Sequence, residues 1–67
     1  MENFIRDIAN RLVEIWGNID STVRWAIESI AGIDVVEAIE NGLNSLIEYL
    51  SGLSDAILNA IARIIGL

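Results

Sequence analysis

The sequence predicts an all-α fold, a compact four-helix bundle of short helices, from three observations. Apolar residues recur every three or four positions along most of the chain, and no stretch alternates apolar and polar residues as a strand would. Glycines or capping residues stand at the junctions between these periodic stretches. The chain contains no proline, so glycines and caps supply all of its punctuation. A three-helix bundle is the alternative arrangement.

The first two helices are predicted over residues 3–16 and 20–31. Gly17 is a natural left-handed terminator for the first of them. Trp25 lies on the flank of the second, and we expect its ring to be half-buried at a contact. The two apolar stripes consist of Phe4, Ile5, Ile8, Leu12, Ile15 and Trp16, and of Ile19, Val23, Ala26, Ile27 and Ile30.

The third helix is predicted over residues 34–51. Asp34 with Glu37 three residues later forms a capping-box pattern, which indicates the start of this helix. Gly42 falls inside the segment, and a glycine in a helix interior costs about 1 kcal/mol relative to alanine. Because the apolar stripe keeps its phase across Gly42, we predict one continuous helix, with a break at this glycine as the alternative.

The fourth helix is predicted over residues 54–66, with Ser54 as its cap. After the cap, the clearly polar side chains are Asp55, Asn59 and Arg63, which lie within an arc of roughly 80°. A helix that is apolar over the rest of its circumference must be surrounded by other helices, another copy or lipid. We therefore expect this C-terminal helix to be the most buried of the four.

Small residues predict one close helix contact. Ala38 and Gly42 are spaced i,i+4 in the third predicted helix, and Ala56 and Ala60 have the same spacing in the fourth. We expect these two pairs to face each other and to bring the helices to the short end of the usual separation of about 8–10 Å.

The charge balance is acidic, with four arginines, no lysine, ten acidic residues and a net charge of −6. Such a chain repels the phosphates of nucleic acids and anionic lipid headgroups, so a nucleic-acid partner is not expected. No segment approaches the 18 or so apolar residues of a membrane span, and no secretory signal is visible. We expect a soluble protein, cytoplasmic if it is natural, for which membrane binding is an unfavoured alternative.

The residue types exclude most catalytic chemistry. Histidine, cysteine and lysine are all absent, so the commonest general base, thiol nucleophile and Schiff-base amine are missing. The carboxylates of residues 34–51 are the remaining candidates, and we interpret them as the solvated face of a helix: Asp34, Glu37, Glu40 and Glu48. We therefore predict no enzymatic activity, no catalytic or cofactor-binding residues and no metal site.

Surplus apolar surface supports the main functional hypothesis. Hydrophobic residues make up 54% of a chain of only 67 residues, more than so small a core requires. This predicts a structural module that self-associates as a homodimer or higher oligomer, through Trp25, Leu58, Ala62 and Ile65. Two alternatives are a helical groove that binds an amphipathic or basic peptide and a protein active at membrane surfaces.

The residue usage also bears on the origin of the chain. Five residue types are absent, and caps and glycines fall at nearly every junction, as in a de novo designed bundle. Idealised designs, however, usually cover helix surfaces with lysine and glutamate, whereas asparagine, serine and arginine serve that purpose here. A natural and a designed origin both stay open.

Overall fold

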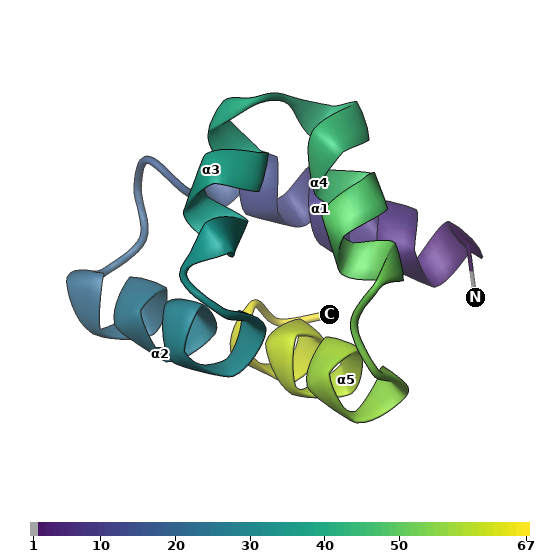
Figure 1. Cartoon of the computed structure of the whole chain (residues 1–67). Helices are drawn as coiled ribbons and strands as arrows, with labels where there is room; N and C mark the ends of the chain where they lie inside the picture. Colours follow the sequence, from purple (N-terminus) through teal and green to yellow (C-terminus); the bar gives the residue numbers. More distant parts are fainter. Residues whose placement is uncertain (1) are drawn as a thin grey trace.

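A computed structural model describes residues 2–67, with side chains from Asn3 onward. The described part is all-α, as predicted, but it contains five helices and not four. They are α1 (Glu2–Ile15), α2 (Ser21–Ala31), α3 (Asp34–Glu40), α4 (Leu43–Ser51) and α5 (Asp55–Ile64). Figure 1 shows α1 behind the α3–α4 pair, with α2 and α5 across the opposite side of the molecule. In this part of the chain, no helix combines the length and hydrophobicity required to cross a bilayer.

The single helix predicted over residues 34–51 is wrong, because the backbone turns at Gly42. Its φ of 109° and ψ of 172° lie in a region that is open almost only to glycine. The amide of Asn41 still bonds to the carbonyl of Glu37, after which α3 ends and α4 starts at Leu43. The turn folds α4 back against α3, and α4 also packs against α1.

The predicted contact between small residues is also wrong. Nothing lies within 4 Å of the position that a Cβ on Gly42 would occupy, so no backbone approaches this glycine closely. Ala56 is exposed, and α5 packs against α1 and α2. The prediction depended on Gly42 continuing the helix, and the turn at this residue removes that geometry.

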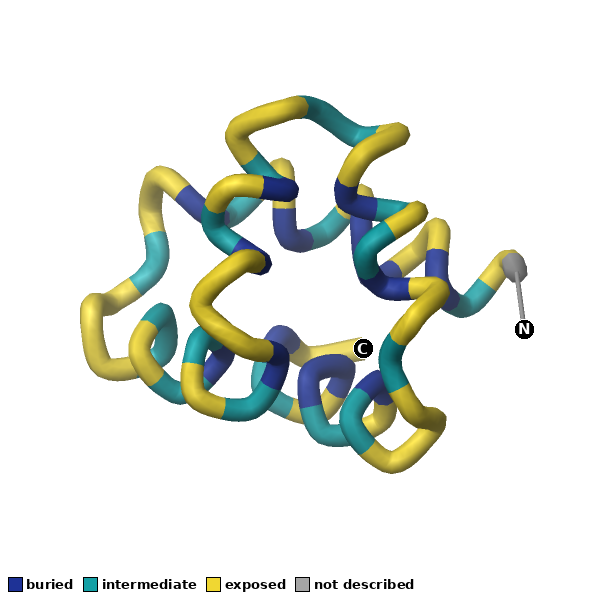
Figure 2. Tube along the Cα trace, viewed as in Figure 1, coloured by how far each residue is buried: buried dark blue, intermediate teal, exposed yellow. Residues whose placement is uncertain are grey.

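Every helix contributes to one apolar core (Figure 2). Each of the five supplies at least one side chain that is almost wholly inaccessible to solvent. The core residues are Ile5, Ile8, Ala9, Leu12, Trp16, Ile27, Ala31, Val35, Ala38, Leu46, Leu50, Leu58, Ile61, Ala62 and Ile65. None of the buried residues in the described part is polar or charged, so burial of apolar surface dominates the stabilisation.

Helix α5 does not stand apart from the others in its burial. Three of its 10 residues are buried, about the same share as the four of 14 in α1. Its outer face is exposed at Asp55, Asn59 and Arg63, and Ala56 beside them is exposed as well. The C-terminal helix is therefore one wall of the core and not a helix enclosed by the rest.

The two predicted caps have different outcomes. The hydroxyl of Ser54 accepts a hydrogen bond from the amide of Ile57 at 3.3 Å, which confirms the cap of α5. Asp34 is not a cap, because it is the first residue of α3 and Ile33 occupies the N-cap position without a side-chain bond. The carboxylates of Asp34 and Glu37 still lie in the first turn, where they complement the helix dipole.

Candidate functional site: the outer face of α2

The structure separates the four residues predicted for self-association. Leu58, Ala62 and Ile65 are 1%, 4% and 7% exposed and belong to the core. Their apolar arc of α5 is covered by α1 and α2, so they cannot reach a partner unless the fold opens. Trp25 is 69% exposed, more than the half-buried position expected for it. It is the one predicted contact residue on the surface.

Trp25 lies on a surface of α2 that carries no exposed charge. We call this surface the α2 face, and it comprises the exposed residues from the start of α2 to the α2–α3 corner. Its members are Ser21, Thr22, Trp25, Ser29, Gly32 and Ile33. Ile33 is 75% exposed, the most exposed large hydrophobic residue in the described part. Ile33 is not among the residues predicted for self-association, although its position just after Gly32 marks it as a corner residue.

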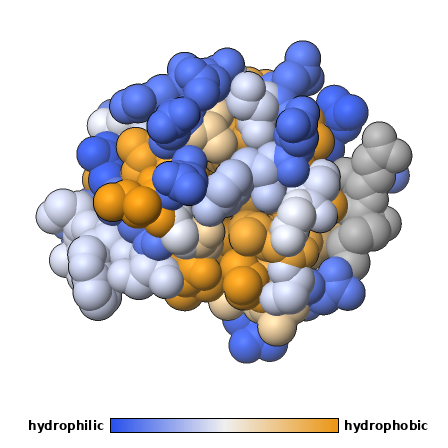
Figure 3. Space-filling model, viewed as in Figure 1, coloured by the Kyte–Doolittle hydropathy of each residue, from blue (hydrophilic) through white to orange (hydrophobic). Residues whose placement is uncertain are grey.

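The other four helices all expose charged side chains. Their exposed residues include Asp7 and Glu14 on α1, Glu37 on α3, Glu48 on α4 and Asp55 on α5. Figure 3 shows the contrast, with strongly hydrophilic surface over α3 and α4 at the top and near-neutral surface over α2 at the lower left. On α2 itself, Arg24 and Glu28 are partly exposed, and Glu28 borders the α2 face at i+3 from Trp25.

The N-terminal half of α2 is attached to the end of α1 through Arg24. Its Nη2 donates a hydrogen bond to the carbonyl of Trp16 at 2.7 Å, and its guanidinium carbon lies 5.1 Å from the centre of the Trp16 ring. A cation over an indole face is attracted by the ring quadrupole, and the cation also suits the carbonyl end of α1. The charge of Arg24 is thus used within the fold.

The C-terminal end of α2 is attached to α4 through Tyr49. The phenol donates a hydrogen bond of 2.6 Å to the carbonyl of Ala31, the last residue of the helix. A Cβ on Gly32 would come within 2.9 Å of this phenol oxygen, and Gly32 has a φ of 96°. Both requirements favour glycine at the corner. With both ends held, the α2 face is presented on a fixed helix.

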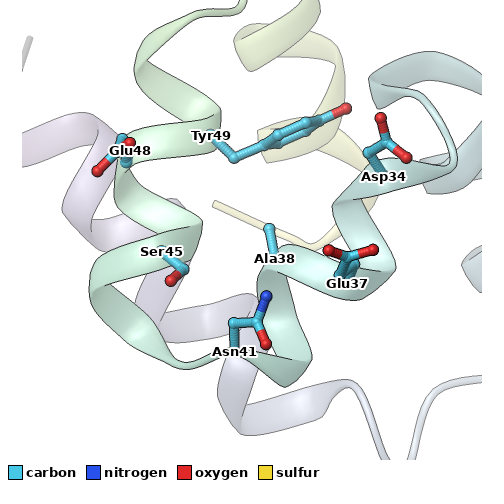
Figure 4. A pocket seen from close by; sticks show the side chains of 7 residues that line it. All are labelled: Asp34, Glu37, Ala38, Asn41, Ser45, Glu48 and Tyr49. Carbon is cyan, nitrogen blue, oxygen red and sulfur yellow. The ribbon is translucent and has the colours of Figure 1, made fainter.

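A second surface feature is an acidic hollow between α3 and α4. It has a volume of about 490 Å³ and is lined by Asp34, Glu37, Ala38, Asn41, Ser45, Glu48 and Tyr49. Figure 4 shows Asp34 and Glu37 on the α3 side of the depression, near the Tyr49 ring, and Glu48 on α4 with its carboxylate turned away from these two. Among the described residues, no group of acidic side chains is close enough to hold a metal ion. Its polar lining differs from the apolar groove that an amphipathic helix would need.

The hollow exists because of the turn at Gly42. In a continuous helix, Glu48 would lie far along the axis from Asp34, since each residue adds about 1.5 Å. The turn brings α4 back beside α3, so Glu48 lines the same depression as Glu37. The sequence shows these acids but places them on one long solvated face.

No protein-family model, curated protein sequence or solved structure matches this chain. Among the surfaces of its helices, the α2 face is the one that lacks fully exposed charged residues.

Proposed function

We propose that this protein is a non-catalytic structural module that self-associates through the α2 face. One observation supports this above others: the α2 face carries Trp25 on the helix and Ile33 at the α2–α3 corner, and none of its fully exposed residues is charged. Tryptophan is enriched among the residues that dominate binding energy at interfaces. Burial of such a surface in an interface gains free energy from its two large apolar side chains. Its desolvation costs little, because it carries few charged groups.

Electrostatics favours this face for contact between identical copies. Two chains that each carry a net charge of −6 repel one another, and acidic residues brought face to face add to that repulsion. Contact through the α2 face avoids juxtaposing exposed carboxylates at its centre, where Trp25 and Ser29 lie. The acidic residues Asp20 and Asp34 flank its two ends.

The size of the face predicts a weak interaction. A standard interface buries about 800 Å² per partner, which is about a fifth of the 4097 Å² that this chain exposes. One face of an 11-residue helix with its corner covers less than that. We therefore expect a reversible homodimer with a dissociation constant in the micromolar range or weaker, and not an obligate dimer.

Sedimentation velocity from low micromolar to submillimolar concentration tests the proposal. The wild-type chain is expected to move from 7.4 kDa towards twice that mass as concentration rises. Trp25→Ser is expected to stay monomeric. The matched control is Val13→Ser, which removes an exposed apolar side chain from α1 and should associate like the wild type. Circular dichroism verifies that both variants keep their helices.

Fluorescence gives an independent readout, because the two tryptophans differ in exposure. Trp16 is 9% exposed and Trp25 is 69% exposed, so a soluble quencher acts mainly on Trp25. Self-association should lower the quenching constant as the protein concentration rises. A wild-type chain that remains 7.4 kDa throughout would contradict the proposal. Protection of Trp25 by neutral vesicles in such a monomer would favour the membrane-surface alternative.

A further inference from the structure

The turn between α3 and α4 contains the one asparagine of the chain that is followed by glycine. Asn41 is exposed there, and Gly42 follows it with a φ of 109°. Every other asparagine in the sequence precedes a residue that has a side chain. At this turn, therefore, a side-chain amide lies next to a backbone amide that no side chain shields.

We propose that Asn41 is a site of spontaneous deamidation, at which the backbone nitrogen of Gly42 attacks the side-chain carbonyl carbon of Asn41. The attacking nitrogen gives its proton to hydroxide, and the new N–C bond closes a succinimide ring. The side-chain nitrogen leaves as ammonia after it takes a proton from water. Water then opens the ring at either of its two carbonyl carbons. One opening gives aspartate, and the other gives isoaspartate, in which the former side-chain carbonyl belongs to the main chain.

Glycine favours this attack because it has no Cβ to crowd the nitrogen and leaves the backbone free to rotate. Nothing beyond its chain neighbours lies within 4 Å of the position that a Cβ on Gly42 would occupy, so no other segment obstructs ring closure. Asn18 gives the contrast within the same chain. It is also exposed in a turn, but it precedes Ile19, whose branched Cβ crowds the backbone nitrogen.

The folded turn slows the reaction without preventing it. The amide of Gly42 donates a hydrogen bond to the carbonyl of Ile39 at 3.2 Å, and Asn41 has a ψ of −4°, which turns this amide away from the Asn41 side chain. Attack therefore requires the end of α3 to open and Asn41 to rotate about its Cα–C bond. Exposed helix ends open at a small cost in free energy. The rate of deamidation in the folded protein thus reports how often this turn opens.

Deamidation would change the acidic hollow, because Asn41 lines it together with Glu37 and Glu48 (Figure 4). Either product replaces a neutral amide with a carboxylate, so the net charge becomes one unit more negative than −6. Isoaspartate also lengthens the main chain by one methylene at the turn that brings α4 beside α3. We expect the isoaspartate form to be less stable than the variant Asn41→Asp, which adds the same charge on an unaltered backbone.

Peptide mapping by mass spectrometry, after incubation of the folded chain in mildly alkaline buffer, tests the proposal. Asn41 is expected to convert about tenfold faster than Asn18, and faster still in urea, where the turn is open. The control variant is Asn41→Gln, which keeps the amide but would have to close a larger and slower-forming ring, so conversion at this position should stop. Urea denaturation of the converted protein and of Asn41→Asp compares their stabilities.

Two outcomes would overturn the proposal. Conversion of Asn41 no faster than that of Asn18 would show that glycine at position 42 does not activate it. Conversion in urea alone would show that the folded turn locks the amide of Gly42. Circular dichroism during the incubation verifies that the reacting chain is folded. Neither outcome bears on self-association, since Asn41 and Gly42 lie outside the α2 face.

Discussion

At the scale of single residues, two polar contacts attach α2 to its neighbours, whereas the core itself is apolar. The Tyr49 phenol satisfies the carbonyl of Ala31, and the Arg24 guanidinium satisfies that of Trp16. These are carbonyls at helix ends, which lack partners within their own helices. Because the core contains no buried polar residue in the described part, such contacts carry much of the orientational specificity.

Tyr49→Phe tests the C-terminal contact. The substitution keeps the ring and removes a 2.6 Å hydrogen bond to a partly buried carbonyl. We expect a loss of about 1–2 kcal/mol in the free energy of unfolding, measured by urea denaturation. Ser51→Ala is the control, since it removes an exposed hydrogen bond within α4 and should change stability by less than about 0.5 kcal/mol. Equal effects of the two substitutions would contradict a special role for the Tyr49 contact.

The sequence predicts most of the buried residues of the first helix, but fewer of those in the segments that follow. Of the six residues in the stripe predicted for the first helix, Ile5, Ile8, Leu12 and Trp16 are buried, whereas Phe4 and Ile15 are partly buried. A single helical period over residues 34–51 favours Val36 and Ile39 as core residues, but these are only partly buried, and the buried residues of α3 are Val35 and Ala38. The turn at Gly42 separates α3 from α4, so one helical period does not describe both segments.

At the scale of elements, three helices could be predicted to within two residues at each end, and one segment could not. The periodicity of side chains reports which residues share a face, but it does not report the φ angle of a glycine. Keeping a glycine helical costs only about 1 kcal/mol, so local preference leaves the choice open. Packing decides between a continuous helix and a turn, because the turn lets α4 pack against α1 while α3 packs against α2.

Gly42→Ala tests the importance of this turn. The backbone at Gly42 lies at φ 109° and ψ 172°, where a side chain adds strain of about 1–3 kcal/mol. The space around it is open, so the whole cost arises from the backbone. Gly17→Ala is the matched control, because Gly17 also has open space but no positive φ. Urea denaturation should show a clear loss for Gly42→Ala and little change for Gly17→Ala; the reverse order would contradict the argument.

At the scale of the whole molecule, a sequence pattern does not show whether an apolar residue faces the core of its own chain or the surface. The flank position of Trp25 beside the apolar stripe predicts a residue near the surface, and its exposed fraction of 69% is larger than the half-buried position expected. Leu58, Ala62 and Ile65 could not be assigned correctly, because the apolar arc of α5 is wide enough for either a partner or two neighbouring helices. Only the arrangement of α1 and α2 around it shows that the molecule uses this arc itself.

The distribution of charge over the molecule predicts how self-association depends on salt concentration. At about 0.01 M salt the Debye length is about 30 Å, longer than the 28 Å maximum extent of this chain. Two copies with a net charge of −6 then repel through all their carboxylates, including those far from the α2 face. At about 0.5 M salt this repulsion is screened while burial of Trp25 is not weakened. The association constant for self-association should therefore rise with salt concentration.

The sign of this salt dependence separates a second copy from a cationic partner. A basic peptide held at Asp34, Glu37 and Glu48 would be released as salt screens its attraction to the acidic hollow. Sedimentation of the wild-type chain across a sodium chloride series measures the first effect, and a fluorescent oligoarginine peptide measures the second. Self-association that weakens steadily with salt would show that contacts between opposite charges hold the copies together. That result would exclude the uncharged α2 face as the centre of the interface.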